Sequence, residues 1–305
     1  MSDAATQMSD ASFEMFRALF LDRLGLYFED HRRYLVEKRV AGRMQALGLQ
    51  RHEDYLALIK GKQGLEEFQA LTNAITVNET YFNRENYQLQ CLTRHLLPEI
   101  MESRRQLGVS EREPVRIWSI PCSTGEEAYS LAMQLLEDWP DVDRHEVEIH
   151  ASDVDTDALA KARQGIYGER ALRLLPAVRR QRFFQPAGDG CQRIHEAIRR
   201  SVIFSQVNLS TDEWRNAMPT MDVIFCRNLL IYFNDATRAR AAARLFDALR
   251  PGGFVCLGHS ESMHRMNDAF LYRRFPEAIV YQRPPQQTSS LPGKTAIGVD
   301  DLACG

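Results

Sequence analysis

Several features that mark particular classes of protein are missing from this chain of 305 residues. No apolar run reaches the roughly 18–20 residues that a membrane-spanning helix needs. The first twelve residues are polar and lack the basic-then-apolar pattern of a secretion signal, so we expect a cytoplasmic protein that does not insert into a membrane. Internal repeats are also missing. With 44% hydrophobic and 26% charged residues, the composition excludes collagen-like architecture and wholesale disorder.

Neither sign of charge predominates, and cysteine occurs in no metal-binding pattern. The 38 basic residues nearly balance 41 acidic ones, for a net charge of −3, so we expect no general nucleic-acid binding. No two cysteines stand in C-x-x-C spacing, and no histidine pair lies beside them at zinc-ligand spacing. We therefore expect no metal site and buried free thiols in a reducing compartment. The six are Cys91, Cys122, Cys191, Cys226, Cys256 and Cys304.

The pattern of apolar residues divides the chain into a helical part and a β/α part. Phe16, Leu19, Phe20 and Leu24 recur at three- and four-residue steps, and similar patterns predict an all-helical N-terminal domain over residues 13–88. From Pro114 onward, short apolar strands alternate with helices, which is typical of a parallel sheet covered by helices. The α/β domain should span 89–284, with strands at 115–120, 147–152, 222–226, 254–258 and 278–282 and helices at 126–137, 155–164 and 236–249.

Two further segments depart from this alternation. Residues 171–206 show short apolar stretches around a glycine-rich turn, at 183–184, 193–198 and 202–204, which predict a small antiparallel insertion. Residues 285–305 are rich in Pro, Gln, Ser and Thr and then in Gly and acidic residues, so we expect a disordered tail.

The turn after the first predicted strand, Ser123–Glu127, points to a particular class of ligand. A nicotinamide-binding turn would read G-x-G-x-x-G to let the backbone approach a pyrophosphate, but this turn has one glycine and two glutamates. A carboxylate repels a pyrophosphate and suits a cationic, hydroxyl-rich ligand. S-adenosylmethionine fits, because it carries an amino group, a sulfonium and a ribose but no phosphate. The alternative is a tight turn whose glutamates interact with the helix dipole.

Polar residues also follow the next two strands. Asp153 ends the second strand, where an acidic side chain can accept hydrogen bonds from ribose hydroxyls. Alternatively, Asp153 or Asp155 caps the following helix. Arg227 and Asn228 directly follow the third clear strand, at the edge where open α/β sheets bind ligands.

Six motifs, in order and with matching spacing, resemble the CheR family of S-adenosylmethionine-dependent methyltransferases, which methylate glutamates of chemotaxis receptors. The resemblance covers residues 13–283 and implies a Rossmann-like methyltransferase domain with an antiparallel insertion, preceded by an all-α domain. The motifs are N-x-T-x-F-x-R at 78–84, S-T-G-E-E at 123–127, A-S-D-x-D at 151–155, V-N-L at 207–209, C-R-N-x-x-I-Y-F at 226–233 and G-H-S-E at 258–261.

The resemblance also implies roles for individual residues. It places Glu126 at the methionine end of S-adenosylmethionine and Asp153 at the ribose. Tyr232 matches the family's tyrosine near the methyl group and is the candidate catalytic residue. Where the family often has proline after the paired glutamates, this chain has Ala128, a helix-compatible change. The other implied cofactor contacts are Asn78, Thr80, Arg84, Asn208, Leu209, Arg227 and Asn228.

The expected partner is the cytoplasmic signalling domain of a chemoreceptor, bound by a monomer. A basic segment carrying Arg39 and Arg43 is a candidate docking surface for an acidic receptor helix; alternatively, it is an ordinary solvated face. Some family members bind a receptor's C-terminal pentapeptide as an added strand. The turn between Phe184 and Arg193 looks about three residues shorter than in those members, so we expect recognition without the pentapeptide.

Three other functions remain open at this point. One is methylation in another chemosensory pathway, such as a pilus-linked one, and another is methylation of a small molecule or of another protein. The third is a non-catalytic regulator that binds S-adenosylmethionine. Intact Asn78, Arg84, Glu126, Asp153 and Tyr232 argue against the regulator. A nucleotide-dependent dehydrogenase is disfavoured by the missing glycines.

Overall fold

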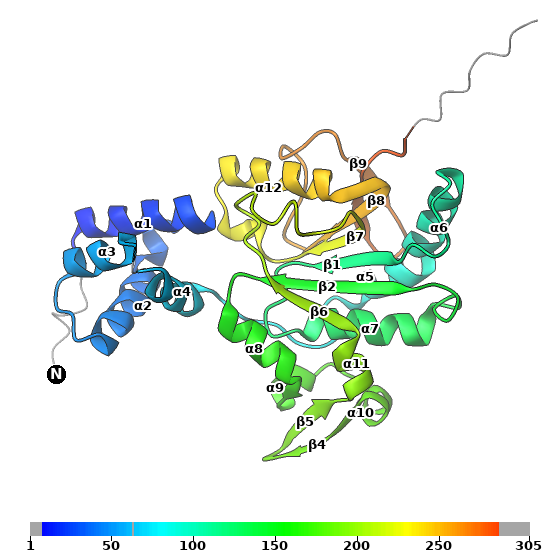
Figure 1. Ribbon diagram of the computed structural model, residues 1–305, viewed down its shortest axis with the longest axis horizontal. Helices are drawn as coiled ribbons and strands as arrows, with labels where there is room; N and C mark the ends of the chain where they lie inside the picture. Colours follow the sequence, from blue (N-terminus) through cyan, green and yellow to red (C-terminus); the bar gives the residue numbers. More distant parts are fainter. Residues whose placement is uncertain (1–7, 63, 287–305) are drawn as a thin grey trace, which may run out of the picture.

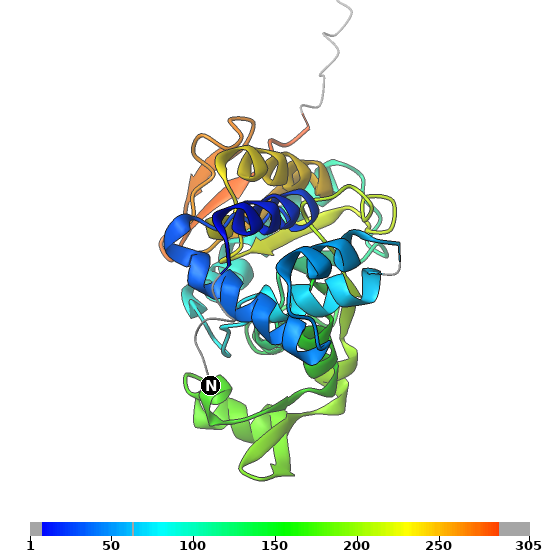
Figure 2. The ribbon, with the colours of Figure 1, turned by 90° about the vertical axis from the view of Figure 1, so that its left-hand side faces the viewer.

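The computed structural model describes residues 8–62 and 64–286 (Figure 1). Of the tail predicted to be disordered, residues 287–305 lie outside the described residues, as does Cys304. A group of helices at one end of the molecule is followed by a large sheet with helices on both faces, and a small second sheet projects at the bottom of both views (Figures 1 and 2).

Helices form the N-terminal part, as their apolar periodicity predicts. Phe16, Phe20 and Leu24 of the first helix are buried in one apolar cluster with residues of the other helices. This helix begins at the N-cap Ser9, whose hydroxyl accepts the Ser12 N–H at 3.1 Å. The elements are α1 (Asp10–Leu24), the 3-10 turn η2 (Asp30–Arg32), α2 (Arg33–Ala46), α3 (His52–Lys60) and α4 (Leu65–Ile75).

Gly25 lets α1 end directly against the second domain. Its φ is +73°, in the left-handed region that glycine tolerates best. A Cβ there would lie 2.8 Å from both Ser210 Cβ and Thr237 Cγ2, which is closer than carbon atoms approach. Any larger residue would therefore push the N-terminal helices away from the methyltransferase sheet.

A seven-stranded sheet forms the second part, with the strand order β6-β2-β1-β7-β8-β10-β9. The strands from β6 to β8 run parallel, and β10 pairs antiparallel with both β8 and β9. Strand order reverses between β1 and β7, which is where open α/β sheets form a crevice for ligands. The bounds are β1 (Val115–Ser119), β2 (Val147–Asp153), β6 (Val202–Gln206), β7 (Met221–Cys226), β8 (Leu249–Leu257), β9 (Leu271–Arg274) and β10 (Ile279–Gln282).

Neighbouring strand residues face opposite apolar layers, because side chains alternate along a strand. Ile117 packs in a cluster with Leu131 of α7, whereas Trp118 packs in the cluster that holds Leu245 of α12 and the N-terminal helices. The N-terminal domain is thus continuous with the α12 layer. The helices of this part are α5 (Asn86–Cys91), the π-helical η3 (Leu92–Leu96), α6 (Leu97–Gln106), α7 (Glu126–Asp138), α8 (Thr156–Gln164), the 3-10 turn η4 (Leu230–Tyr232) and α12 (Asp235–Ala248).

The predicted antiparallel insertion is confirmed as a separate three-stranded sheet of order β3-β5-β4. Its hairpin turns at Asp189-Gly190, with φ of +49° and +71°, the signs that a two-residue type I′ turn requires. Its elements are β3 (Ile166–Tyr167), α9 (Glu169–Leu172), α10 (Ala177–Phe183), β4 (Phe184–Gly188), β5 (Cys191–Ile194) and α11 (Glu196–Arg200).

Two details of the insertion differ from the sequence-based prediction. The strand expected at 202–204 is β6, which pairs in parallel with β2 and belongs to the large sheet. The second half of the stretch expected as a strand at 193–198 lies in α11, where Glu196 pairs with Arg199 and Arg200 at helical spacing. Local sequence does not reveal which strand a short apolar segment will pair with.

Candidate functional site

Two adjoining cavities open at the reversal point of the sheet. The larger encloses about 840 Å³, part of it open to solvent, between the N-terminal helices and the strand ends. The smaller, of about 520 Å³, lies between the linker after α4 and the start of α7. Four residues line both cavities, so they form one cleft: Val77, Pro121, Ser123 and Asn228.

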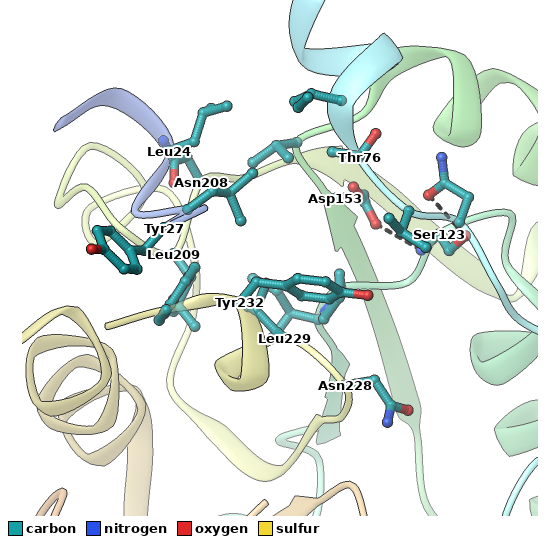
Figure 3. A pocket seen from close by; sticks show the side chains of 18 of the residues that line it. Leu24, Tyr27, Thr76, Ser123, Asp153, Asn208, Leu209, Asn228, Leu229 and Tyr232 are labelled. Atoms are coloured by element: carbon teal, nitrogen blue, oxygen red, sulfur yellow. Dashed lines mark hydrogen bonds between the residues drawn. The ribbon is translucent and has the colours of Figure 1, made fainter. Parts of the chain in front are cut away.

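Asp153 supplies the carboxylate of the larger cavity (Figure 3). Only 4% of the residue is exposed, and its carboxylate accepts the N–H of Ser123 at 2.7 Å and that of Asp155 at 2.9 Å. Burial raises the pKa of Asp153 to about 6, although the backbone N–H groups oppose this shift. The carboxylate is therefore mostly ionised at pH 7 and can accept hydrogen bonds from ligand hydroxyls.

Asp155, not Asp153, caps the following helix. Its carboxylate accepts the N–H groups of Asp157 and Ala158, both at 2.9 Å. It also accepts Nδ2 of Asn78 at 2.6 Å and Oγ1 of Thr76 at 2.7 Å, which fastens the interdomain linker to the end of β2. The two interpretations of this motif thus apply to different residues, and Asp153 is left facing the cavity.

Asn78 bridges two turns at the mouth of the cleft. While its Nδ2 binds Asp155, its Oδ1 accepts the Ser123 hydroxyl at 3.1 Å. Thr80 and Arg84, further along the same linker, line the smaller cavity, and Arg84 donates to the Glu79 carbonyl at 2.8 Å. The linker is therefore part of the wall of the cleft.

The smaller cavity has an ionic floor built around Arg227. This guanidinium is 5% exposed and binds Glu127 at 2.8 Å and Glu85 at 3.1 Å, and it donates to the Arg84 carbonyl at 2.8 Å. Burial raises the pKa of Glu127, although Arg227 opposes this shift. Burial also acts to raise the pKa of Glu85, but Arg227 and its other partners hold that pKa below the ordinary value. Two carboxylates around one buried cation leave excess negative charge for a cationic ligand.

The two adjacent glutamates of the first turn face different surroundings. Glu127 lines the smaller cavity and accepts the Ser119 hydroxyl at 2.7 Å. Glu126, which the resemblance places at the cofactor, lines neither cavity; its carboxylate accepts the Thr124 hydroxyl at 2.7 Å. Neighbours on a helix point about 100° apart, so only one of the pair can face the cleft.

Tyr232 lies in the wall of the larger cavity, where two domains hold it in place. In Figure 3 its ring lies between Asp153 and Asn228. Its backbone carbonyl accepts the Tyr27 N–H at 2.8 Å, and the Arg32 guanidinium lies 5.4 Å from its ring centre. Among the described residues its hydroxyl has no hydrogen-bond partner. Burial raises the pKa of Tyr232, with Arg32 and Arg84 opposing, so the group is a neutral phenol at pH 7.

Glu261 holds the loop that carries Tyr232, a role that sequence reasoning did not identify. One carboxylate oxygen accepts the N–H groups of Asn228 at 2.7 Å and Gly258 at 2.9 Å, and the other accepts the Leu230 N–H at 2.7 Å. Asn228 has a φ of +61°, so the loop turns sharply there. The signal in the sequence was the G-H-S-E motif, but Asn228 and Leu230, two of the three N–H donors to Glu261, lie about thirty residues earlier.

Asn208 and Leu209 also lie in the wall of the larger cavity. Asn208 donates to the Arg23 carbonyl at 2.6 Å and accepts the Ser210 N–H at 2.9 Å, so its side chain joins the end of α1 to the loop after β6. Leu209 is 3% exposed and contributes an apolar surface.

The structure separates the two candidate docking arginines of α2. Arg39 is exposed. Arg43 is instead bound to Glu67 of α4 at 2.6 Å, and the Tyr55 hydroxyl donates to the same carboxylate at 2.7 Å. The charge of Arg43 is therefore compensated within the N-terminal domain, and its docking role, like that of Arg39, stays a prediction. Neither residue lines the cleft.

Two features of the described residues bear on other classes of site. None of their helices is both long and apolar enough to cross a membrane. Residues 8–62 and 64–286 also contain no group of three His, Cys, Asp or Glu side chains arranged to hold a metal ion.

The cleft suits S-adenosylmethionine in its chemical groups. A buried carboxylate faces a largely apolar cavity, and the adjoining ionic cavity offers carboxylates and guanidinium groups for an amino-acid end. The helix N-terminus that would bind a pyrophosphate carries Glu126 and Glu127 instead.

Comparisons with known proteins agree with this fit. The all-alpha domain of CheR methyltransferases matches residues 11–76, and their SAM-binding domain matches residues 78–279. Chemotaxis protein methyltransferase 2 of Vibrio cholerae is 42% identical, covering 91% of this chain and 94% of that protein. The chemotaxis protein methyltransferase of Salmonella typhimurium is 35% identical, covering 87% and 88%, and chemotaxis protein methyltransferase 2 of Pseudomonas aeruginosa is 37% identical, covering 82% and 86%. The chain therefore belongs to the CheR family of methyltransferases, with S-adenosylmethionine as its cofactor.

Proposed function

We propose that this protein transfers the methyl group of S-adenosylmethionine to glutamate side chains on the cytoplasmic signalling domain of chemotaxis receptors. The products are a glutamate methyl ester and S-adenosylhomocysteine. The names of the relatives, chemotaxis protein methyltransferases, support the pathway. The observation that carries the chemistry is the neutral Tyr232 hydroxyl, which has no partner in the described part of the chain and lines the cavity next to Asn228, where the two cavities meet.

The substrate needs alignment more than activation. A glutamate has a pKa near 4.3, so it is already a carboxylate at pH 7 and needs no general base. When bound, the cofactor supplies an electrophilic methyl group on a sulfonium. Charge is lost as this cation and the carboxylate become neutral products, so a dry, rigid site favours the reaction. Tyr232 can orient the carboxylate by donating one hydrogen bond, without the strong counter-charge that would stabilise the reactant.

The residues of the cleft have distinct proposed roles toward the cofactor. Asp153 accepts hydrogen bonds from the ribose hydroxyls, and Glu127 faces the amino group in place of Glu126. Arg84, with Thr80, binds the carboxylate. Asn78, Asn208, Leu209, Arg227 and Asn228 complete the walls, Arg227 by holding Glu127 and Glu85 in place.

We also propose that receptor recognition does not use a C-terminal pentapeptide. Adding a strand requires a free sheet edge with available N–H groups. In the insertion the edge strands are β3, which has only two residues, and β4, and Pro186 in the middle of β4 has no N–H to donate. The hairpin turn beside it is only the two residues Asp189 and Gly190, which leaves little wall for an aromatic side chain.

Methyl transfer from radiolabelled S-adenosylmethionine to purified receptor signalling domains tests both statements. We expect base-labile label, released as methanol, on receptors with and without the pentapeptide at equal rates. Base-stable label would place the methyl group on nitrogen and contradict the glutamate assignment. A rate that depends on the pentapeptide, or a low-micromolar dissociation constant for the free peptide, would contradict the second statement.

A further inference from the structure

Charge is distributed unevenly along the chain. Residues 163–200, which form the insertion and its flanks, hold nine arginines against three carboxylates, a net charge of +6. The whole chain has a net charge of −3, so the remainder carries −9. A segregation of this size creates a local positive potential that attracts anionic partners.

Several of these arginines are neutralised within the protein. Arg179 pairs with Glu137 at 2.5 Å, Arg180 with Glu169 at 2.9 Å, and Arg199 and Arg200 both with Glu196 at 2.6 Å. These side chains fasten the insertion together or to α7. These ion pairs compensate part of the positive charge of the insertion, and a smaller set of its arginines remains to be explained.

Arg170 and Arg173, here called the rim arginines, stand beside the smaller cavity. Arg173 lies 3.6 Å from the ring centre of Tyr81, a residue that lines this cavity. Arg170 is 84% exposed, and its nearest carboxylate is that of Glu79, another lining residue, at 3.7 Å. Among the described residues Arg173 has no carboxylate partner within 4 Å; it stacks on an aromatic ring instead.

Arg84 shares an aromatic neighbour, Tyr81, with the rim arginine Arg173. Arg84 lines the same cavity, and its guanidinium lies 5.7 Å from the centre of the Tyr81 ring. The segment they contact is fixed, because the Phe82 N–H donates to the Ala171 carbonyl at 3.0 Å. Two guanidinium groups, those of Arg84 and Arg173, therefore lie against Tyr81, and Arg170 stands beside Glu79, which lines the same cavity.

We infer that the rim arginines Arg170 and Arg173 form a docking surface that binds acidic side chains flanking the substrate glutamate on a partner helix. This inference rests on the proposed function and names the recognition element that it leaves open. A helix places side chains three and four residues apart on one face, about 5–6 Å between Cβ atoms. With one glutamate in the cleft, its acidic neighbours on that face reach the rim. Exposed Arg39 of α2 adds positive charge on the N-terminal domain.

Binding of a synthetic acidic helix to the full chain tests this inference. The probe is a fluorescein-labelled coiled-coil peptide with glutamates at helical spacing on one face, followed by fluorescence anisotropy. Arg170→Glu with Arg173→Glu should weaken binding about tenfold at low salt, since each reversed charge turns attraction into repulsion. The wild-type affinity should itself fall with added salt.

A matched control changes the same net charge elsewhere in the insertion. Arg193 is exposed on β5 and Arg200 is paired with Glu196 on α11, so Arg193→Glu with Arg200→Glu should change binding less than about twofold. Arg170→Glu alone alters only an exposed side chain and keeps the test valid if the double variant unfolds. Calorimetry with S-adenosylhomocysteine should give the same affinity for all variants.

Several outcomes would overturn the inference: no binding of the probe to the wild type, equal weakening by both double variants, or a parallel loss of S-adenosylhomocysteine binding. Loss of binding to phosphatidylglycerol vesicles, without any effect on the peptide, would show instead that the surface meets a membrane. Methylation of the peptide is measured separately. Rim-dependent binding without methylation would contradict the proposed function and leave the docking surface in place.

Discussion

Lowering the pH from 7 to 5 should weaken binding of S-adenosylmethionine about tenfold by protonating Asp153. Burial raises the pKa of this carboxyl to about 6, so about nine-tenths is ionised at pH 7 and about one-tenth at pH 5. Its two oxygens already accept two backbone N–H groups, and the protonated form loses acceptor capacity for the ribose hydroxyls. Only the ionised fraction binds well, and a tenfold fall corresponds to about 1.4 kcal/mol.

Calorimetry in two buffers of different ionisation enthalpy measures both the affinity and the protons released. We expect release of about 0.1 proton per cofactor at pH 7, about 0.5 at pH 6 and about 0.9 at pH 5. Asp153→Ala should bind about 1–3 kcal/mol more weakly at pH 7 and lose this proton release. A wild-type affinity that is equal at pH 7 and pH 5, or a variant with the same proton release, would refute the reasoning.

The same pKa determines how Asp153 affects folding without the cofactor. Its pKa is raised from 3.8 to about 6, so its contribution to stability is fully present below 3.8 and is lost as the pH rises through 6. The shift corresponds to roughly 3 kcal/mol. Part of this contribution is already lost at pH 4, so the free energy of unfolding of Asp153→Ala, relative to wild type, should rise by about 2 kcal/mol between pH 4 and pH 7. Urea titrations at these pH values measure it.

Four further substitutions distinguish effects on catalysis from effects on folding. Glu261→Gln should lower kcat about tenfold or more, because an amide replaces one of the carboxylate oxygens that accept the loop N–H groups. Its affinity for the cofactor should stay within about twofold of wild type. Steady-state kinetics measures kcat, and calorimetry measures the affinity. Tyr232→Phe should lower kcat about tenfold with an unchanged melting temperature, since the hydroxyl makes no hydrogen bond within the described residues. Arg43→Glu should lower the free energy of unfolding by about 1–3 kcal/mol, because the new carboxylate faces Glu67; urea titrations measure this. Arg39→Glu should change the free energy of unfolding by less than about 0.5 kcal/mol and should slow receptor methylation only at low salt.

The sheet and the place of the cleft could be predicted because they depend on local patterns. Apolar strands followed by polar residues at 153 and 227–228 mark the carboxyl edge of a parallel sheet, and a ligand crevice forms at that edge. The strand at 202–206 could be predicted as a strand but not placed in the large sheet. Its partner β2 lies about fifty residues earlier, and its own side chains look the same in either sheet.

Long-range partners explain most of what the sequence did not reveal. The charge of Arg43 looked available because its partner Glu67 is 24 residues away on another helix. Glu85 and Glu261 meet the residues after β7 only in the folded chain. Which of the two glutamates at 126–127 faces the cleft depends on the rotation of α7, which a single turn of sequence does not fix.

The way in which the N-terminal helices close the larger cavity has a consequence for turnover. Leu24, Phe28 and Ile75 form one wall and the strand ends form the other, and a single linker joins them. Hydrogen bonds such as Gln69 Nε2 to the Val154 carbonyl, at 2.9 Å, hold the walls together. Parting these walls widens the way out for the spent cofactor, so we expect its residence time to depend on the domain interface. Substitutions that touch no reacting atom would then set the speed of the catalytic cycle through product departure.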